Sequence, residues 1–371
     1  MDYQIDIRAG RLTIRTRRED LPLGELLDFA SRQNPRRGFL FVSRVLGKHI
    51  PVRPARMRQI YDRLAERIDW LPGPVVVMGM AETATGLAGG VADSLQRLSP
   101  DRESIYLHTT RHHLDRELLA CFDEHHSHAP DHLIYRPDPR LEPLFRRAAS
   151  LVLVDDEIST GRTLAGLARG LAGSMPQLQQ LVLVSIVDWL SHQRRAELIG
   201  SLAPSCPAPG FTSLLEGDFD FTPDANHRPK LPLTVAARRR SGFTRPDTGR
   251  LGLRLPRELD ESCLAGLPDG PLVVVGTGEY TFEPFLLAER LEALGRDVLF
   301  QSTTRSPILP GEAIASRRVF PDDHGEGVTN YLYNLPPERT PVVVYEHPAM
   351  VEGHPLPGLI GGVAWTLPPG K

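Results

Sequence analysis

Short apolar runs alternate with amphipathic stretches along the first part of the chain. Residues 75–78 and 151–154 are apolar runs with the length and composition of buried strands. Residues 23–32 and 55–69 carry apolar side chains at helical spacing, and this alternation of strand and helix continues to residue 187. The pattern predicts an α/β fold with a mostly parallel sheet that is flanked by helices.

Two domains are expected from the same pattern. Residues 1–205 form the first domain, in which a segment over 1–50 precedes a core over 51–205. Residues 206–250 are rich in proline, glycine and charge, which predicts a linker. A second α/β pattern occupies residues 251–371 and forms the other domain.

A strand, two acids, a hydroxyl-rich loop and a helix follow one another from residue 151. Asp155 and Asp156 stand where the strand formed by the apolar run is expected to end, and the loop 159–163 opens an amphipathic run. The first N–H groups of a helix have no partner inside it, so this loop suits an anion. Carboxylates beside it suit ribose hydroxyls or a metal, although an ordinary polar turn and helix cap would have similar residues.

The second half resembles the first at matched positions. Residues 273–279 resemble 76–82, and the Thr-Thr-Arg triplet at 303–305 matches the triplet at 109–111. After the strand of the second half that corresponds to 151–154, the two acids are replaced by Tyr and Glu, and the Thr-Gly loop is absent. The second domain is therefore a candidate degenerate repeat of the first, although two unrelated α/β modules would also share such features.

Composition narrows the classes of function. The net charge of −3 over 371 residues does not favour nucleic acid as a partner. The three cysteines are far apart in the sequence, which suits a reducing compartment without a disulfide framework. No segment approaches the roughly 18 apolar residues of a membrane span. We expect a cytoplasmic protein that binds neither nucleic acid nor membrane.

Residues 151–163 resemble the phosphoribosyl pyrophosphate (PRPP) motif of type I phosphoribosyltransferases. That motif has four apolar residues, two acids, a short variable stretch and then Thr-Gly-x-Thr/Ser. The chain as a whole resembles a family with an orotate phosphoribosyltransferase-like domain followed by a TRSP domain, which is associated with tellurium-resistance and stress gene clusters. The segments that carry this wider resemblance are Thr304-Arg305-Ser306-Pro307 and residues 37–43, 45–49, 81–86, 124–128 and 330–334.

The resemblance implies that PRPP is a ligand and Mg²⁺ its cofactor. The 5′-phosphate would lie on the loop, whose residues are Ser159, Thr160, Gly161, Arg162 and Thr163. Asp155 and Asp156 would accept hydrogen bonds from the ribose hydroxyls and hold Mg²⁺, directly or through water. Their charge near C1′ would stabilise an oxocarbenium-like transition state more than the ground state.

The turn after residues 75–78 is the candidate cradle for pyrophosphate. Its residues Met80, Ala81, Glu82 and Thr83 precede a helix and could offer backbone donors. The resemblance implies a strained or cis non-proline peptide near residues 80–82. Glu82 would position Mg²⁺ or a substrate amine, or only begin a helix. Arg111 is the best cation of an expected lid over residues 108–132. Glu82 and Arg111 are both candidate catalytic groups.

The acceptor is less well defined. Asp188 and Trp189 end the strand where relatives of this fold contact the base, and Trp189 would either stack on a ring or pack in the core. Ser159 stands where purine-type relatives often carry Asp, which makes a purine less favoured. Glu124, His125, His126 and His128 lack standard zinc spacing, so metal binding there ranks below substrate contact or plain lid structure.

These features predict PRPP-dependent transfer of a phosphoribosyl group to an unidentified nitrogen nucleophile, in the synthesis of a nucleoside-like metabolite. The alternative is a PRPP-binding regulator or scaffold without transferase activity, and a weaker reading is a metal hydrolase built on the histidine cluster. The partners expected are PRPP and the acceptor. A homodimer is compatible with the sequence.

Overall fold

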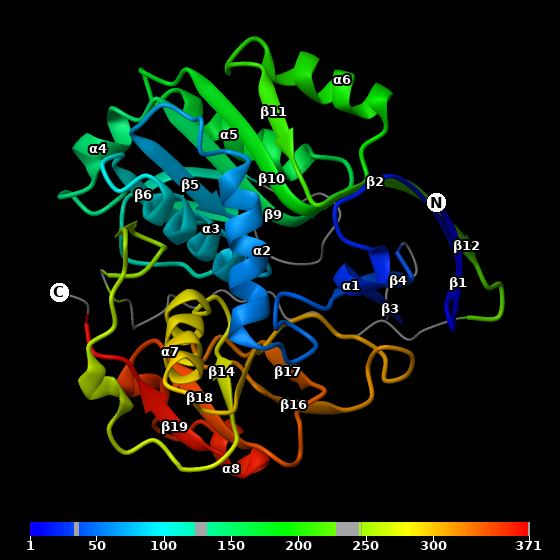
Figure 1. Cartoon of the computed structure of the whole chain (residues 1–371), viewed down its shortest axis with the longest axis vertical. Coiled ribbons are helices and arrows are strands. Elements are labelled where there is room, and N and C mark those ends of the chain that lie inside the picture. Colours follow the sequence, from blue (N-terminus) through cyan, green and yellow to red (C-terminus); the bar gives the residue numbers. More distant parts are fainter. Residues whose placement is uncertain (33–36, 123–131, 228–244, 246, 370–371) are drawn as a thin grey trace.

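Two sheets, one from each half of the chain, form the framework of the protein (Figure 1). The structure is a computed structural model that describes residues 1–32, 37–122, 132–227, 245 and 247–369. Within these residues, no helix combines the length and the apolar character needed to cross a membrane.

The larger sheet has a parallel core. Its neighbouring strands are, in spatial order, β6 (Ser104–His108), β5 (Val75–Gly79), β9 (Ser150–Ile158) and β10 (Gln180–Asp188). The helices of this half are α1 (Leu23–Leu26), α2 (Pro54–Glu66), α3 (Thr85–Leu98), α4 (Glu142–Arg146), α5 (Arg162–Ala172) and α6 (His192–Leu202). The apolar runs of these strands are buried on both faces, as expected for a parallel sheet between helices. The predicted α/β architecture is confirmed.

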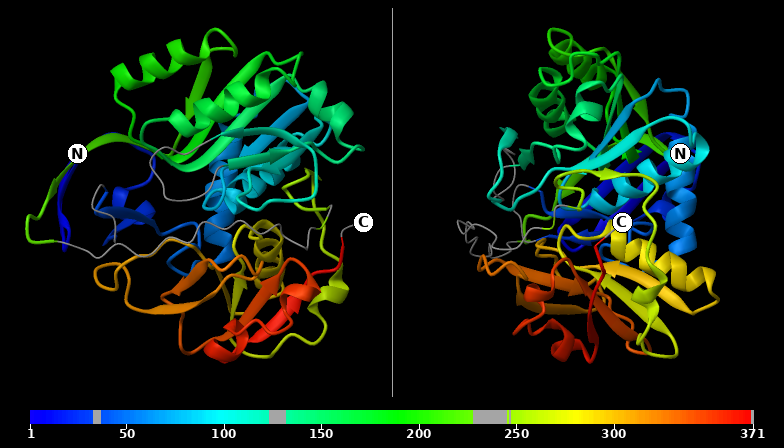
Figure 2. Two further views of the ribbon diagram at one scale, coloured as in Figure 1. Left: turned by 180° about the vertical axis from the view of Figure 1, so that it is seen from behind. Right: turned by 90° about the vertical axis from the view of Figure 1, so that its left-hand side faces the viewer.

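An antiparallel arm extends this sheet on the far side of β10. β11 (Pro209–Thr212) and β12 (Leu215–Pro223) both pair with β10, and β12 continues alongside β2 (Gly10–Glu19), which pairs with β1 (Asp2–Ile7). The views in Figure 2 show this arm projecting from one side of the sheet. The prediction of a linker over 206–250 is therefore wrong for residues 209–223. The proline and glycine in β11 do not prevent pairing, because this strand pairs with β10 on one side only.

The start of the chain also differs from the prediction. The helix expected over residues 23–32 is limited to α1, because the chain turns into β3 (Leu27–Ser31), which pairs with β4 (Phe39–Ser43). In a segment as short as β3, the spacing of the apolar side chains alone cannot distinguish a strand from a helix.

The second sheet is wholly parallel and repeats the order of the first. Its strands are β15 (Val298–Ser302), β14 (Leu272–Gly276), β18 (Thr340–Tyr345) and β19 (Val363–Thr366). In both parallel cores the second strand along the chain lies beside the first, and the third and fourth follow on the other side. A hairpin separates the second and third strands in each half, namely β7 (Leu118–Phe122) with β8 (His132–Tyr135), and β16 (Arg317–Pro321) with β17 (Thr329–Tyr333). This shared topology supports the proposed repeat.

The remaining elements belong to the part of the chain after β12. They are β13 (Leu253–Arg254), which pairs with β6, the 3₁₀ helices η1 (Glu261–Leu264) and η2 (Pro348–Met350), and the helices α7 (Phe282–Ala293) and α8 (Leu356–Ile360).

The halves share one apolar core around α2, α3 and α7. The Tyr61 ring of α2 lies edge-on to Phe285 of α7, with centroids 5.1 Å apart. Glycines on α3 make this approach possible, because a Cβ at Gly90 would lie 2.1 Å from the Tyr61 ring and one at Gly89 would lie 2.4 Å from Phe282. Close packing of this kind leaves little freedom for one half to move against the other.

His49 is buried where the first half meets the second. Its side chain is 6% exposed, and neither ring nitrogen has a hydrogen-bond partner among the residues that the structure describes. The Tyr333 ring lies 5.8 Å away. Burial, and after it the charges of Lys48 and Arg32, lowers the pKa of His49 to about 3. The imidazole is therefore neutral in the folded protein at any moderate pH.

We expect His49→Leu to protect the protein against mild acid. As the pH falls below about 6.5, the unfolded wild-type chain binds a proton at this residue that the folded chain does not bind. The wild type should therefore lose about 2 kcal/mol of unfolding free energy relative to the variant between pH 7.5 and pH 5. Urea unfolding at both pH values measures this difference. His192→Leu, at an exposed position, is the control. Its unfolding free energy relative to the wild type should be the same at both pH values.

Candidate functional site

The carboxyl ends of neighbouring parallel strands meet at one edge of the larger sheet. Gly79 of β5 pairs with His108 of β6 on one side and with Val154 of β9 on the other. The Met80 N–H donates to the Val154 carbonyl at 3.0 Å. The turn after β5 therefore lies directly beside Asp155, at the edge where open α/β sheets bind their ligands.

The acid pair is part of β9. The strand runs on to Ile158, so the expectation that it ends before Asp155 is wrong, and pairing with β10 continues past both acids. Both residues are partly exposed, and the Asp156 N–H donates to Asp155 Oδ1 at 3.0 Å. Strand geometry thus fixes the backbone of the pair.

The two carboxylates disfavour each other's charge. Burial, and after it the charge of Asp156, raises the pKa of Asp155 well above its usual value. Burial, and after it the charge of Glu157, raises the pKa of Asp156. Glu157 itself is paired with Arg37. An acid pair whose ionisation is disfavoured in this way is stabilised by hydroxyl donors or by a hard cation beside it.

A fit to Mg²⁺ can be judged from this donor set. Among the described residues, no group of three or more His, Cys, Asp or Glu side chains could hold a metal ion. Mg²⁺ in phosphate sites is bound through one or two carboxylates and is completed by water and by phosphate oxygens. Asp155 and Asp156 fit that mode of binding, in which the substrate supplies the remaining ligands.

The loop after β9 presents a helix N-terminus to this edge. Gly161 is the N-cap residue of α5 with φ of +67°, and its carbonyl accepts the first helical bond, from Ala165 at 2.9 Å. Thr160 Oγ1 lies 3.4 Å from the Arg162 nitrogen. The N–H groups of the first turn have no partner within the helix. The predicted loop residues Ser159, Thr160, Gly161, Arg162 and Thr163 thus surround a helix start, as an anion site requires.

The turn after β5 contains a cis peptide between Ala81 and Glu82, as the family resemblance implied. Glu82 Oε1 lies 2.9 Å from Lys48 Nζ and accepts from the Arg305 N–H at 3.2 Å. Burial opposes ionisation, but the charges of Lys48 and Arg305 hold the pKa of Glu82 below its usual value. Glu82 is therefore an ionised group that is already paired, partly with the second half of the chain.

Arg111 lies beside the same turn. Its Nη2 is 3.5 Å from the Ala81 carbonyl oxygen and 3.1 Å from His132 Nε2, and its backbone N–H donates to Glu279 Oε1 at 2.8 Å. The structure thus brings together the predicted residues Met80, Ala81, Glu82, Thr83 and Arg111. The histidine cluster Glu124, His125, His126 and His128 lies outside the described residues.

Asp188 and Trp189 face inward. Asp188 is 1% exposed and pairs with Arg195 at 2.5 Å. Trp189 is 2% exposed and packs against Phe41 and Phe219, with ring centroids 5.0 Å and 5.5 Å away. Their contact with an acceptor stays a prediction, and it would require one of these side chains to become accessible.

Several residues at this edge were not among the candidates. Arg37 neutralises Glu157, and Glu279 and Arg250 reach the Thr110–Arg111 turn from the distant part of the chain. The one signal for Glu279 in the sequence is the resemblance of residues 273–279 to 76–82. Arg250 has no such signal, because it lies in the predicted linker.

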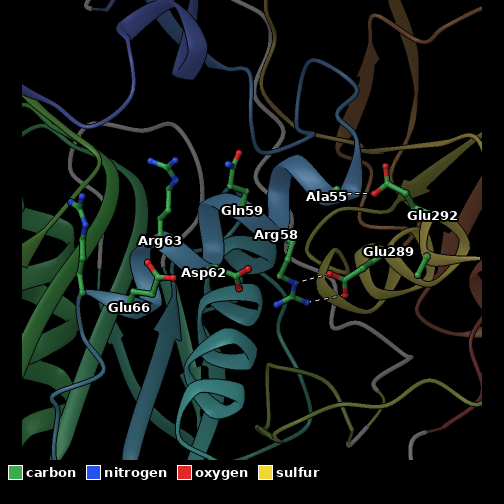
Figure 3. Close-up of a pocket in the computed structure, with 10 residues that line it drawn as sticks. Ala55, Arg58, Gln59, Asp62, Arg63, Glu66, Glu289 and Glu292 are labelled. Atoms are coloured by element: carbon green, nitrogen blue, oxygen red, sulfur yellow. Dashed lines mark hydrogen bonds and ion pairs between the residues drawn. The ribbon is translucent and has the colours of Figure 1, made fainter. Parts of the chain in front are cut away.

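The cavity in Figure 3 lies away from these strand ends. It has a volume of about 780 Å³ and lies between α2 and α7. Arg58 pairs with Glu289 across it at 2.6 Å, whereas Arg67 and Glu292 pair with Asp20 and Arg53, which are not part of the lining. Its lining residues are Ala55, Arg58, Gln59, Asp62, Arg63, Glu66, Arg67, Glu289, Glu292 and Ala293. None of the candidate site residues is among them, so the site is assigned from the strand ends and not from this cavity.

A parallel sheet with an acid pair and a phosphate-type loop at its carboxyl edge defines the phosphoribosyltransferase class. The family model described as phosphoribosyl transferase matches residues 26–217. The model of the TRSP domain, described as C-terminal to that domain, matches residues 238–360. The chain belongs to this two-domain phosphoribosyltransferase family.

Solved adenine phosphoribosyltransferases are similar to about half of the chain. The enzyme from Trypanosoma brucei is 15% identical, with a TM-score of 0.38, over 53% of this chain and 82% of that chain. The enzyme from Giardia lamblia is 13% identical, with a TM-score of 0.36, over 53% of this chain and 97% of that chain. The search among curated proteins gave no match.

We expect Gly161→Ala to lower the unfolding free energy by about 1–2 kcal/mol, the usual cost of a side chain in the left-handed region. The new Cβ would also lie 2.6 Å from Leu198 Cδ2, so that side chain must move. Gly173→Ala, just after the other end of α5, is the matched control: its backbone is right-handed helical and the space around it is open. Urea denaturation of both variants measures the effect, and equal stabilities would contradict the assigned conformation.

Proposed function

We propose that this protein transfers the phosphoribosyl group of PRPP to a nitrogen nucleophile with the help of Mg²⁺. The observation that carries the proposal is the junction from β9 to α5, where the acid pair, the Gly161 loop and a helix N-terminus follow one another beside the turn after β5. No other arrangement among the described residues combines these groups at a strand end.

The loop over residues 159–163 would bind the 5′-phosphate. Backbone N–H groups and the α5 dipole favour a dianion, and each favourable charge–dipole contact contributes roughly 0.3–1 kcal/mol. Asp155 and Asp156 would accept hydrogen bonds from the ribose hydroxyls. Because both residues are partly exposed, the ribose hydroxyls could approach them.

The acid pair would also assist departure of pyrophosphate. As the bond at C1′ breaks, positive charge develops on the ribose, and two fixed carboxylates nearby stabilise that state more than the ground state. Mg²⁺, held by these carboxylates directly or through water, would neutralise charge on the leaving pyrophosphate. The leaving pyrophosphate would be bound by backbone groups of residues 80–83 and by the guanidinium of Arg111.

The acceptor is proposed only as a class. Ser159 cannot serve as a general base, which disfavours an acceptor that needs a carboxylate at that position. We infer a nucleoside-like product, made in the cytoplasm. The link to tellurium resistance and stress, and a homodimeric state, are further proposals that follow from the family resemblance and from the sequence.

A second candidate function is a PRPP-binding regulator. The observation that favours it is the pairing of Glu82 with Lys48 and Arg305, which commits a residue of the pyrophosphate turn to contacts within the chain. Pyrophosphate release in the presence of a panel of nitrogenous bases separates the two functions. An enzyme releases it with at least one base, whereas a regulator binds PRPP and releases none.

We expect the double variant Asp155→Asn with Asp156→Asn to lose turnover while it stays folded. The amides keep the shape of the carboxylates but remove the charges that bind Mg²⁺ and stabilise the transition state. Calorimetric titration with PRPP and Mg²⁺, pyrophosphate release and circular dichroism check the binding, the activity and the fold.

Asp218→Asn, on the antiparallel arm, is the control and should bind PRPP as the wild type does. Full activity in the double variant would refute the roles of the acid pair. Absence of wild-type binding at millimolar PRPP would refute the proposed function itself.

A further inference from the structure

Each half of the chain inserts one glutamate into the Thr-Thr-Arg turn of the other half. Glu279 accepts a hydrogen bond from Thr110 Oγ1 at 2.6 Å and another from the Arg111 N–H at 2.8 Å. Glu82, at the matching position of the first half, accepts from the Arg305 N–H at 3.2 Å. The contacts are reciprocal, as between two copies related by a twofold axis.

The two turns are built in the same way. The Thr109 N–H donates to the Gly79 carbonyl at 3.0 Å, and the Thr303 N–H donates to the Gly276 carbonyl at 3.0 Å. The Thr109 hydroxyl accepts from the Ala81 N–H at 2.9 Å, as Thr303 does from Gly278 at 2.8 Å. Each turn is then bridged to its own hairpin, through Leu133 in the first half and Tyr331 in the second.

Only one of the halves retains the predicted PRPP chemistry. In the second half, Tyr345 ends β18 and Glu346 follows it, at the positions where the first half has its acid pair, and the Thr-Gly loop has no counterpart. Glu346 is engaged with Arg250. Glu279 therefore supports the turn over residues 109–111, which lies beside the predicted PRPP site. Glu82 supports the turn over residues 303–305, which has no such site beside it.

Glu279 is held firmly enough to act on the turn. Its side chain is 2% exposed, and Arg250 Nε lies 3.0 Å from its Oε2 and 3.2 Å from Thr110 Oγ1. Burial opposes ionisation, but the neighbouring His112 and Arg250 side chains hold the pKa of Glu279 well below its usual value. Hydrogen bonds to an ionised acceptor are about twice as strong as those between neutral groups.

We propose that Glu279 is a positioning residue for the pyrophosphate part of the PRPP site. It fixes the backbone at Thr110 and Arg111, so that the guanidinium of Arg111 stays beside the Ala81 carbonyl. The C-terminal half thereby acts as a built-in partner that completes the site of the first half. This inference rests on the proposed function.

The experiment compares three ligands on the full-length chain. PRPP and inorganic pyrophosphate use the Arg111 region, whereas ribose 5-phosphate uses the loop over 159–163 and the acid pair. We expect Glu279→Gln to weaken PRPP and pyrophosphate roughly ten- to hundredfold, because the geometry of Arg111 is lost. Its affinity for ribose 5-phosphate, measured by calorimetry with Mg²⁺, should equal that of the wild type.

Glu346→Gln is the matched control. It makes the same change in another buried partner of Arg250, but Glu346 does not contact Thr110 or Arg111 in the contacts that the structure describes. Its ratio of PRPP to ribose 5-phosphate affinity should stay at the wild-type value. Should Glu279→Gln fail to fold, Glu279→Asp keeps the charge, withdraws the carboxylate by one methylene and should show a smaller loss confined to PRPP and pyrophosphate.

A double-mutant cycle tests whether the effect passes through Arg111. In an Arg111→Gln background, Glu279→Gln should cause no further loss of PRPP affinity. Full additivity, an equal loss of ribose 5-phosphate, or unchanged PRPP affinity would each overturn the inference. Wild-type protein that binds none of the three ligands would instead contradict the proposed function, so the two failures are distinguishable.

Discussion

Two carboxylates fixed side by side on a buried strand repel each other, and the rest of the site follows from that repulsion. Asp155 and Asp156 belong to the central strand β9, so the sheet prevents their backbone from separating. Arg37 neutralises the neighbouring Glu157 but leaves the pair itself without a full complement of charge. Hydroxyl donors and a hard cation relieve the repulsion, and a helix N-terminus a few residues later attracts phosphate. The proposed ligand, a sugar phosphate bound together with Mg²⁺, would satisfy all three requirements.

The second half of the chain stabilises this arrangement from outside. Glycines on α3 allow α2 and α7 to approach closely, and the hydroxyls of Thr85 and Thr281 meet at 2.8 Å across the contact. Buried charges complete the joint, with Glu279 facing the first half and Glu82 facing the second. The same strand order in both parallel cores explains why these contacts come in matched pairs. A degenerate repeat can keep the surface that joins two copies after losing its own acid pair.

Local patterns in the sequence predicted the part of the site that is local in the chain. The strand, acids, loop and helix over residues 150–172 follow one another, so their order and spacing reveal them before any tertiary contact is known. The arm could not be predicted in this way, because β12 pairs with β2, which lies about two hundred residues earlier, with Phe219 opposite Ile14. The burial of Trp189 likewise depends on Phe41 and Phe219, which come from distant segments of the chain. The position of Glu82 in the turn after β5 follows from the sequence, but its pairing with Arg305 depends on the contact between the two halves of the chain.

The most direct test of the account is a crystal structure of the full-length protein with PRPP and Mg²⁺. The account predicts the 5′-phosphate on the N–H groups of the loop over residues 159–163, the ribose hydroxyls on Asp155 and Asp156, and the pyrophosphate between the Ala81 turn and Arg111. PRPP bound elsewhere, for example in the charged cavity between α2 and α7, with the acid pair free of ribose, would contradict it.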